Sequence, residues 1–123
     1  MNMLKTLVLG TVLSTTMVAN ADYQVTMQCR YYGNDLPWWQ CLKSKYADTD
    51  LKLKTNGQTR VYKYYEVAND YQLTNGNFTV TDSFTITVQN ASEYVLGISI
   101  ADAAGREVYQ EEVGQYGVIR VGN

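Results

Sequence analysis

The chain has 123 residues, and 10 Lys and Arg stand against 12 Asp and Glu, which gives a formal net charge of −2. This length fits one small globular domain, and the balanced charge argues against a nucleic-acid binder, which carries a basic excess. The sequence has no histidine. That excludes catalytic triads built on imidazole and zinc sites with histidine ligands.

The first 21 residues have the features of a secretory signal peptide. Lys5 supplies a positive charge, residues 7–18 are mostly apolar, and Ala19-Asn20-Ala21 matches the small-residue cleavage signature. The apolar stretch is shorter than the roughly 20 residues that a transmembrane helix needs. We therefore expect cleavage after Ala21, which leaves residues 22–123 as a single secreted domain without a membrane anchor.

The two cysteines, Cys29 and Cys41, are expected to form one internal disulfide, since cysteines of a secreted chain at short spacing usually pair. Such a bridge would stabilise the fold by about 3 kcal/mol. Pairing between molecules and free thiols are the alternatives. Two cysteines alone cannot complete a four-ligand zinc site, and we predict no metal site and no cofactor.

Alternation of apolar and polar residues dominates the chain after residue 21 and predicts β-strands. The first strand covers 22–32, and a short helical piece follows within 36–45. The Asn56-Gly57 dipeptide predicts a hairpin that pairs 50–55 with 58–67, with Thr55 opposite Gln58 and Leu51 opposite Tyr62. After a turn at Asn75-Gly76, further strands are predicted at 78–80, 84–89, 94–100, 108–113 and 118–121.

About seven short strands separated by turns predict an all-β fold, a small antiparallel β-sandwich of the immunoglobulin-like kind with at most one short helix. The segment FTITVQNASEYVLGISIADAAGREVYQEEV, residues 84–113, resembles the later strands of bacterial immunoglobulin-like domains. That resemblance concerns architecture and does not indicate a function.

Charge is divided unevenly along the chain. Residues 30–63 carry 7 basic against 3 acidic side chains, whereas residues 64–123 carry 2 basic against 8 acidic. The segments either form two ordinary solvated faces, or the first forms a surface suited to an acidic cleft, where complementary charge raises association rate and specificity. The acidic pair Glu111-Glu112 belongs to no catalytic motif, and we predict that the protein is not an enzyme.

Aromatic residues are abundant, with 11 Tyr and 2 Trp. Tyr and Trp are the preferred anchors of protein interfaces, although at least half of these rings should pack in the core. Trp38 and Trp39 are adjacent, so in extended chain only one could point inward.

The short signal peptide, the loop CRYYGNDLPWWQC and a small all-β domain without a catalytic motif resemble the periplasmic immunity proteins of type VI secretion systems. In length and layout the whole chain is similar to the immunity partners of spike-protein (VgrG-type) effectors whose C-terminal domain is a muramidase. The resemblance implies that the protein acts as an antitoxin in the periplasm. It would bind the cell-wall hydrolase domain of the effector and occlude its substrate cleft.

Seven residues are predicted to contact such a partner, because they are aromatic or charged and lie in turns or near the hairpin; they are Tyr32, Asp35, Trp38, Trp39, Lys63, Tyr65 and Arg106. Arg106 lies in a turn, from which a guanidinium could meet a carboxylate in bidentate geometry.

Two other functions compete with this one. A glycan- or peptidoglycan-binding module would use an exposed Trp38 or Trp39 to stack on sugar. A structural or adhesive surface subunit would assemble through its edge strands. An aromatic edge would also allow a homodimer.

Overall fold

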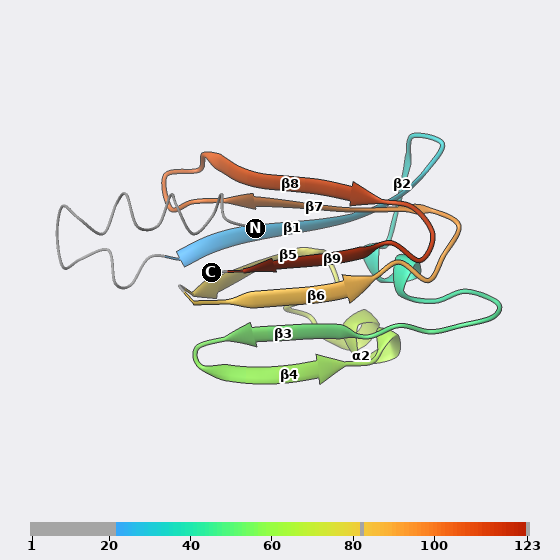
Figure 1. Cartoon of the computed structure of the whole chain (residues 1–123), viewed down its shortest axis with the longest axis horizontal. Coiled ribbons are helices and arrows are strands. Elements are labelled where there is room, and N and C mark those ends of the chain that lie inside the picture. The colour runs from blue at the N-terminus through green and yellow to red at the C-terminus, as the bar shows by residue number, and fades with distance from the viewer. Residues whose placement is uncertain (1–21, 82, 123) are drawn as a thin grey trace, which may run out of the picture.

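The computed structural model describes residues 22–81 and 83–122, so the expected signal peptide lies outside the described residues. Two antiparallel sheets form a sandwich (Figure 1), which confirms the predicted all-β fold. The strands in the described residues are β1 (Asp22–Tyr31), β2 (Asn34–Leu36), β3 (Leu51–Thr55), β4 (Gln58–Tyr62), β5 (Asn77–Thr81), β6 (Thr85–Gln89), β7 (Val95–Ala101), β8 (Glu107–Val113) and β9 (Val118–Gly122).

One sheet has the order β2-β1-β7-β8, with β5 also paired to β1, and the other has the order β4-β3-β6-β9. Alternate residues of these strands point between the sheets, as period-two patterning requires. The fully buried side chains include Val25, Ile86, Leu96, Ile100 and Ile119. The core therefore draws on the inner faces of both sheets.

The hairpin around Asn56-Gly57 has the predicted register, with Thr55 opposite Gln58 and Leu51 opposite Tyr62. Its second strand was predicted to reach residue 67, and this is wrong because helix α2 (Tyr64–Asn69) begins directly after Tyr62 and Lys63. The Glu66 carboxylate accepts a hydrogen bond of 2.8 Å from the backbone N–H of Lys63. This contact satisfies one of the free N–H groups at the start of the helix and favours helix over strand.

The predicted disulfide between Cys29 and Cys41 is present. It joins β1 to η2 (Trp38–Leu42), a short 3-10 helix in the segment that was predicted to hold a short helical piece. Strand β2 was not predicted, and it arises because a turn at Tyr32-Gly33 folds the chain back on the end of β1.

The two ends of the sandwich differ in their connections (Figure 1). The β3–β4 and β7–β8 turns lie at one end. The β1–β2 turn, η2, α2 and the β6–β7 and β8–β9 connections lie at the other. Most of the irregular chain is therefore gathered at this second end, where binding residues are commonly found.

Candidate tyrosine-rich contact surface

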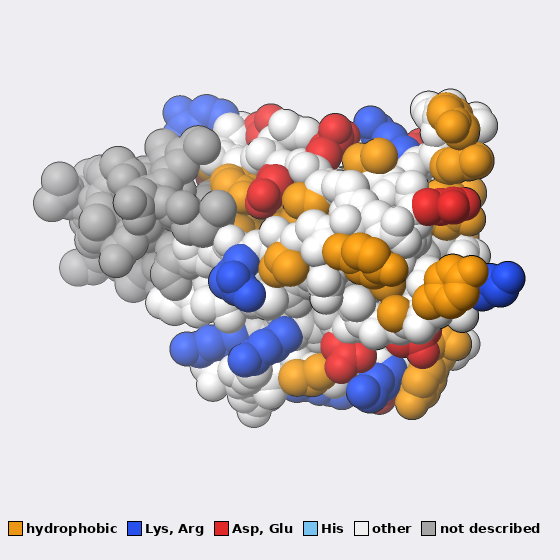
Figure 2. All heavy atoms as spheres, turned by 45° about the vertical axis from the view of Figure 1, so that its right-hand side comes forward, with side chains coloured by type: hydrophobic (Ala, Val, Ile, Leu, Met, Phe, Trp, Pro, Cys, Tyr) orange, Lys and Arg blue, Asp and Glu red, His pale blue; other side chains and the backbone are white. Residues whose placement is uncertain are grey.

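Besides the tyrosines of α2, five tyrosines lie at the end of the sandwich that carries the β1–β2 turn, and we call the surface that these five form the tyrosine-rich end; they are Tyr31, Tyr32, Tyr46, Tyr94 and Tyr116. Four of them are exposed, while Tyr94 is half-buried against the core. Hydrophobic side chains, tyrosines included, gather along this end where it is turned forward (Figure 2). A contiguous group of exposed rings marks an interaction site more strongly than single exposed residues do.

Three of these rings touch one another. The Tyr31 ring lies 4.5 Å from the Tyr32 ring and 5.1 Å from the Tyr94 ring, both edge to face. Edge-to-face contact is a favoured geometry for aromatic pairs. The three rings form a row from Tyr32 in the exposed turn, through Tyr31, to the half-buried Tyr94. Contact with Tyr94 fixes the exposed rings to the fold.

A hollow of about 340 Å³ lies beside this row. Its walls include Lys43, Lys45, Tyr46, Tyr94 and Glu93. The ammonium group of Lys45 lies 5.7 Å from the centre of the Tyr46 ring, a weak cation–π contact at an exposed site. The hollow offers apolar ring faces, phenol groups and two cations to a partner.

Asn90 holds the loops of this end together. Its buried side-chain amide donates to the carbonyl oxygens of Tyr94 (2.7 Å) and Val113 (3.1 Å), and its oxygen accepts from the backbone N–H and hydroxyl of Ser92. Its backbone N–H donates to Gly117. A fully hydrogen-bonded buried amide fixes its neighbours, because breaking the network would leave polar groups unpaired.

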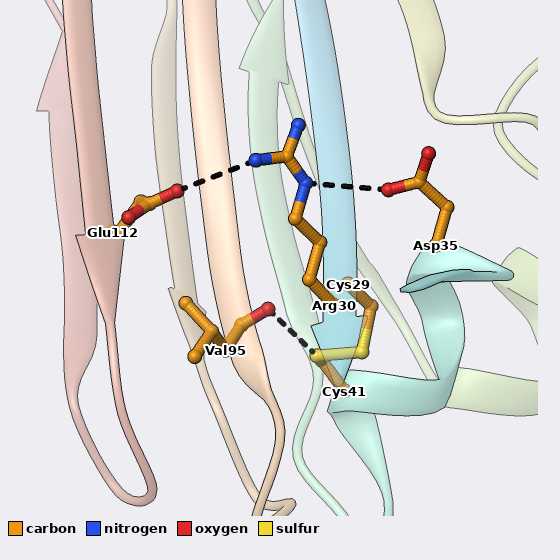
Figure 3. A network of polar contacts seen from close by, with 6 residues as sticks. All are labelled: Cys29, Arg30, Asp35, Cys41, Val95 and Glu112. Atoms are coloured by element: carbon orange, nitrogen blue, oxygen red, sulfur yellow. Dashed lines mark hydrogen bonds and ion pairs between the residues drawn. A yellow bond between two sulfur atoms is a disulfide. The ribbon is translucent and has the colours of Figure 1, made fainter. Parts of the chain in front are cut away.

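Arg30 braces the strands under the β1–β2 turn. Its guanidinium lies 3.2 Å from Asp35 on β2 and 3.9 Å from Glu112 on β8 (Figure 3). The neighbouring Cys29–Cys41 bridge fixes the end of β1 to η2. Exposed ion pairs contribute little stability individually, but here they align three strands below the turn.

A second feature, which we call the cationic groove, lies on the outer side of the β4-β3-β6-β9 sheet. This groove has a volume of about 580 Å³ and is lined by Lys52, Lys63, Tyr65 and Arg120 among others. Lys63 pairs with Asp50 at 3.3 Å. Asp48 and Asp50 also line the groove, so its three cations and two carboxylates leave a net charge of +1.

The structure divides the predicted contact residues between these surfaces. Tyr32 and Asp35 lie on and beside the β1–β2 turn, at the tyrosine-rich end. Lys63 and Tyr65 line the cationic groove. The two surfaces are neighbours, because the ammonium group of Lys43 lies 5.8 Å from the ring of Tyr64 in the groove wall.

The two tryptophans differ in burial, and as expected one of them points inward while the other stays partly exposed. The Trp38 side chain is in the core with 2% exposure, and its indole N–H donates to the Leu73 carbonyl oxygen at 2.6 Å. Trp39 is half-buried and packs against the core. Because the pair lies in the 3-10 helix η2, its side chains do not alternate as they would in extended chain. Trp38 is buried and therefore cannot contact a partner.

Arg106 lies apart from the other candidates, in the β7–β8 turn at the opposite end of the sandwich (Figure 1). Its guanidinium lies 3.2 Å from Asp102, and its backbone N–H donates to the same carboxylate. That N–H is the largest cause holding the pKa of Asp102 below its ordinary value of 3.8. Arg106 and Asp102 therefore stabilise the turn and do not belong to the tyrosine-rich end.

The acidic pair Glu111-Glu112 does not form a paired-carboxylate site. The Tyr109 hydroxyl donates to Glu111, whereas Glu112 faces Arg30. Burial and the hydrogen bond to Glu111 raise the pKa of Tyr109, so its hydroxyl stays protonated. The two carboxylates therefore serve separate contacts.

Sequence reasoning missed Tyr46, Tyr94, Tyr116 and Asn90 as parts of one surface. They lie on connections far apart in the chain, and only the pairing of the sheets brings them together. One sequence feature could have indicated this surface: several tyrosines stand beside polar turn residues, at the ends of predicted strands.

Comparison with models of protein families, with curated proteins and with solved structures found no match. In the part of the chain that the structure describes, no group of three or more Cys, Asp or Glu side chains could hold a metal ion. Nor does any helix there have the length and apolar character to cross a membrane.

Proposed function

We propose that this protein is a periplasmic immunity protein that binds a muramidase-type effector of type VI secretion and occludes its substrate cleft. The observation that carries the proposal is the tyrosine-rich end, where four exposed rings lie at the end of β1 and on three connections, next to the buried Asn90 network and the disulfide. The resemblance of the chain to such immunity proteins supplies the class of partner, and the disulfide fits an oxidising compartment.

Tyrosine suits this role for a physical reason. Its ring buries a large area while losing few rotatable bonds, and its hydroxyl can still hydrogen-bond. Rings that are already fixed before binding cost less entropy on association. The row of Tyr32, Tyr31 and Tyr94 has this fixed character.

The cationic groove next to the tyrosine-rich end would add electrostatic complementarity. Glycoside hydrolases cleave their substrate with a pair of carboxyl groups, so a muramidase cleft presents negative charge. Lys52 and Arg120 could steer such a cleft toward the tyrosine-rich end, which would raise the association rate more than the final affinity. The contact itself would be made by the rings.

The direct test is inhibition of peptidoglycan lysis. The protein, with its disulfide formed, is titrated against the cell-wall hydrolase domain encoded beside its gene, and the turbidity of a peptidoglycan suspension is followed. We expect lysis to stop at a stoichiometric ratio, with ordinary lysozyme unaffected. Full lytic activity of the hydrolase domain in the presence of excess protein would refute the proposal.

A glycan-binding module is the second candidate, because the rings of Tyr46 and Tyr94 flank a hollow beside Lys43 and Lys45. It ranks lower since, of the two tryptophans that were expected to stack on sugar, Trp38 is buried and Trp39 is half-buried. Calorimetric titration with muramyl peptide fragments separates the two: heat of binding to fragments without inhibition of the hydrolase would favour the glycan module.

A further inference from the structure

We propose that Tyr32 is the anchor residue of the contact surface: its ring enters an apolar, ring-sized pocket of the partner protein, where its hydroxyl meets a hydrogen-bond acceptor. This inference rests on the proposed function and adds the single residue on which affinity depends most. It is carried by the backbone of the β1–β2 turn, by the exposure of the ring and by the rigidity of the strands beneath it.

The backbone at Tyr32 has a conformation that tyrosine rarely adopts. Tyr32 has a φ of 50° and Gly33 a φ of 81°, and the two residues form the whole connection between paired Tyr31 and Asn34. The β3–β4 hairpin has the same kind of turn, with a φ of 55° at Asn56 and 74° at Gly57. Asn and Gly favour such turns, whereas a larger side chain is strained there.

The chain itself therefore shows which residue suits this turn. Asn56 occupies in one hairpin the position that Tyr32 occupies in the other. Tyrosine at this position has a cost in stability that asparagine would not have. A strained residue that persists in an exposed turn points to a role outside the fold.

The ring of Tyr32 contributes little to the fold that would explain the strain. Its side chain is 88% exposed. Among the described residues the one ring it meets is Tyr31, and its hydroxyl has no hydrogen-bond partner there. Most of its apolar area is thus free to be buried against a partner.

The strands below the turn hold the ring in place. Arg30 and Asp35 pair across the hairpin, and the next residue along, Cys29, is tied to Cys41. The turn also projects from the end of the sandwich (Figure 1). A projecting aromatic ring on a rigid hairpin is pre-organised, which lowers the entropy cost of binding, and tyrosine is one of the residues in which binding hot spots are enriched.

Tyr116 has a similar backbone, with a φ of 66°, but the fold explains it. Its backbone N–H donates to the Asn90 carbonyl oxygen at 2.6 Å, and its own carbonyl accepts from the side chain of Gln89. These bonds fix the β8–β9 connection whatever side chain is present. No such hydrogen bonds explain the positive φ of Tyr32, so we assign the role of anchor residue to Tyr32 alone.

The test uses a substitution that suits the turn better while removing the ring. Tyr32→Asn copies the Asn56-Gly57 turn, and Tyr32→Gly removes all strain at the position. Both variants should have a Tm equal to or up to roughly 4 °C above that of the wild type. Both should bind the cell-wall hydrolase domain encoded beside the gene at least about 30-fold more weakly, chiefly through faster dissociation.

Tyr71→Asn is the matched control, because Tyr71 is 84% exposed, its φ is not positive, and it follows α2, outside the five tyrosines that define the tyrosine-rich end. It should bind as the wild type does. Wild-type affinity in both Tyr32 variants, with the wild type itself binding tightly, would overturn the anchor and leave the proposed function intact. Absence of binding by the wild type would instead overturn the proposed function, and the anchor with it.

Discussion

Trp38 and Tyr32 lie in the same disulfide loop, yet one ring is buried and the other is exposed. The partner that decides this for Trp38 is the Leu73 carbonyl oxygen, which lies 35 residues away in sequence. Composition and alternation identified both rings as candidates for contact, but they hold no information about such a distant partner. The burial of aromatic residues in loops was therefore the least predictable part of the site.

Trp38→Phe tests the structural role of the buried indole. Phenylalanine cannot donate to the Leu73 carbonyl and leaves part of the indole volume empty, so we expect a loss of about 1–3 kcal/mol in the free energy of unfolding. Leu73 keeps its hydrogen bond from the Gly76 backbone N–H, which limits the loss. Denaturant titration measures it. Unchanged stability together with lost partner binding would mean that Trp38 contacts the partner.

Asp102 gives the folded protein a defined dependence on pH. Its carboxylate accepts from the backbone N–H groups of Arg106 and Ala104, so the pKa in the folded state lies below the ordinary 3.8. The ionised group therefore stabilises the fold above pH 4, and this contribution is lost as the pH falls through the folded-state pKa. Asp102→Asn should be less stable than the wild type at pH 7.

Thermal unfolding of both proteins between pH 7 and pH 2.5 checks this dependence. The stability difference between the wild type and Asp102→Asn should shrink as the pH falls below 4. A difference that stays constant over this range would show that the charge of Asp102 does not contribute.

The elements that could be predicted are those whose signals are local. The register of the β3–β4 hairpin follows from Asn56-Gly57 and the alternation on either side. Helix α2 was missed because its capping contact, between Glu66 and the Lys63 backbone, competes with a strand pattern that continues through it. Strand β2 was missed because its turn has tyrosine where asparagine is usual.

Gly76 lies where the chain passes close to β1, between the segments of β1 that pair with β5 and with β2. The Met27 backbone N–H donates to the Gly76 carbonyl oxygen at 2.7 Å. A Cβ atom on Gly76 would lie 2.6 Å from the Met27 carbonyl oxygen and 3.1 Å from the Trp38 ring. The position therefore requires glycine for space as well as for its φ of 82°.

Gly76→Ala and Gly57→Ala separate these two requirements. Gly57 has a φ of 74° but no atom near its Cβ position, so alanine there should lower the free energy of unfolding by about 1 kcal/mol. Gly76→Ala should lower the free energy of unfolding by about 1–3 kcal/mol more than Gly57→Ala does, because the backbone must move to admit the methyl group. Equal losses in denaturant titration would contradict the close approach to β1.

At the scale of the whole molecule, the two ends of the sandwich differ in what their connections do. The end with the β3–β4 and β7–β8 turns is held by local contacts such as Asp102 with Arg106. The opposite end gathers exposed tyrosines and lies next to the cationic groove. The charge excess of residues 30–63 could be counted from the sequence. The tyrosines of the tyrosine-rich end come together only through strand pairing between distant segments, which the sequence did not reveal.

Amide hydrogen exchange of the protein, free and bound to the muramidase-type effector domain that we propose as its partner, tests most directly whether the tyrosine-rich end is the contact surface. We predict that binding slows exchange at the β1–β2 turn, in residues 43–48 and in residues 114–117. Protection confined to the β3–β4 and β7–β8 turns, at the opposite end of the sandwich, would contradict the account.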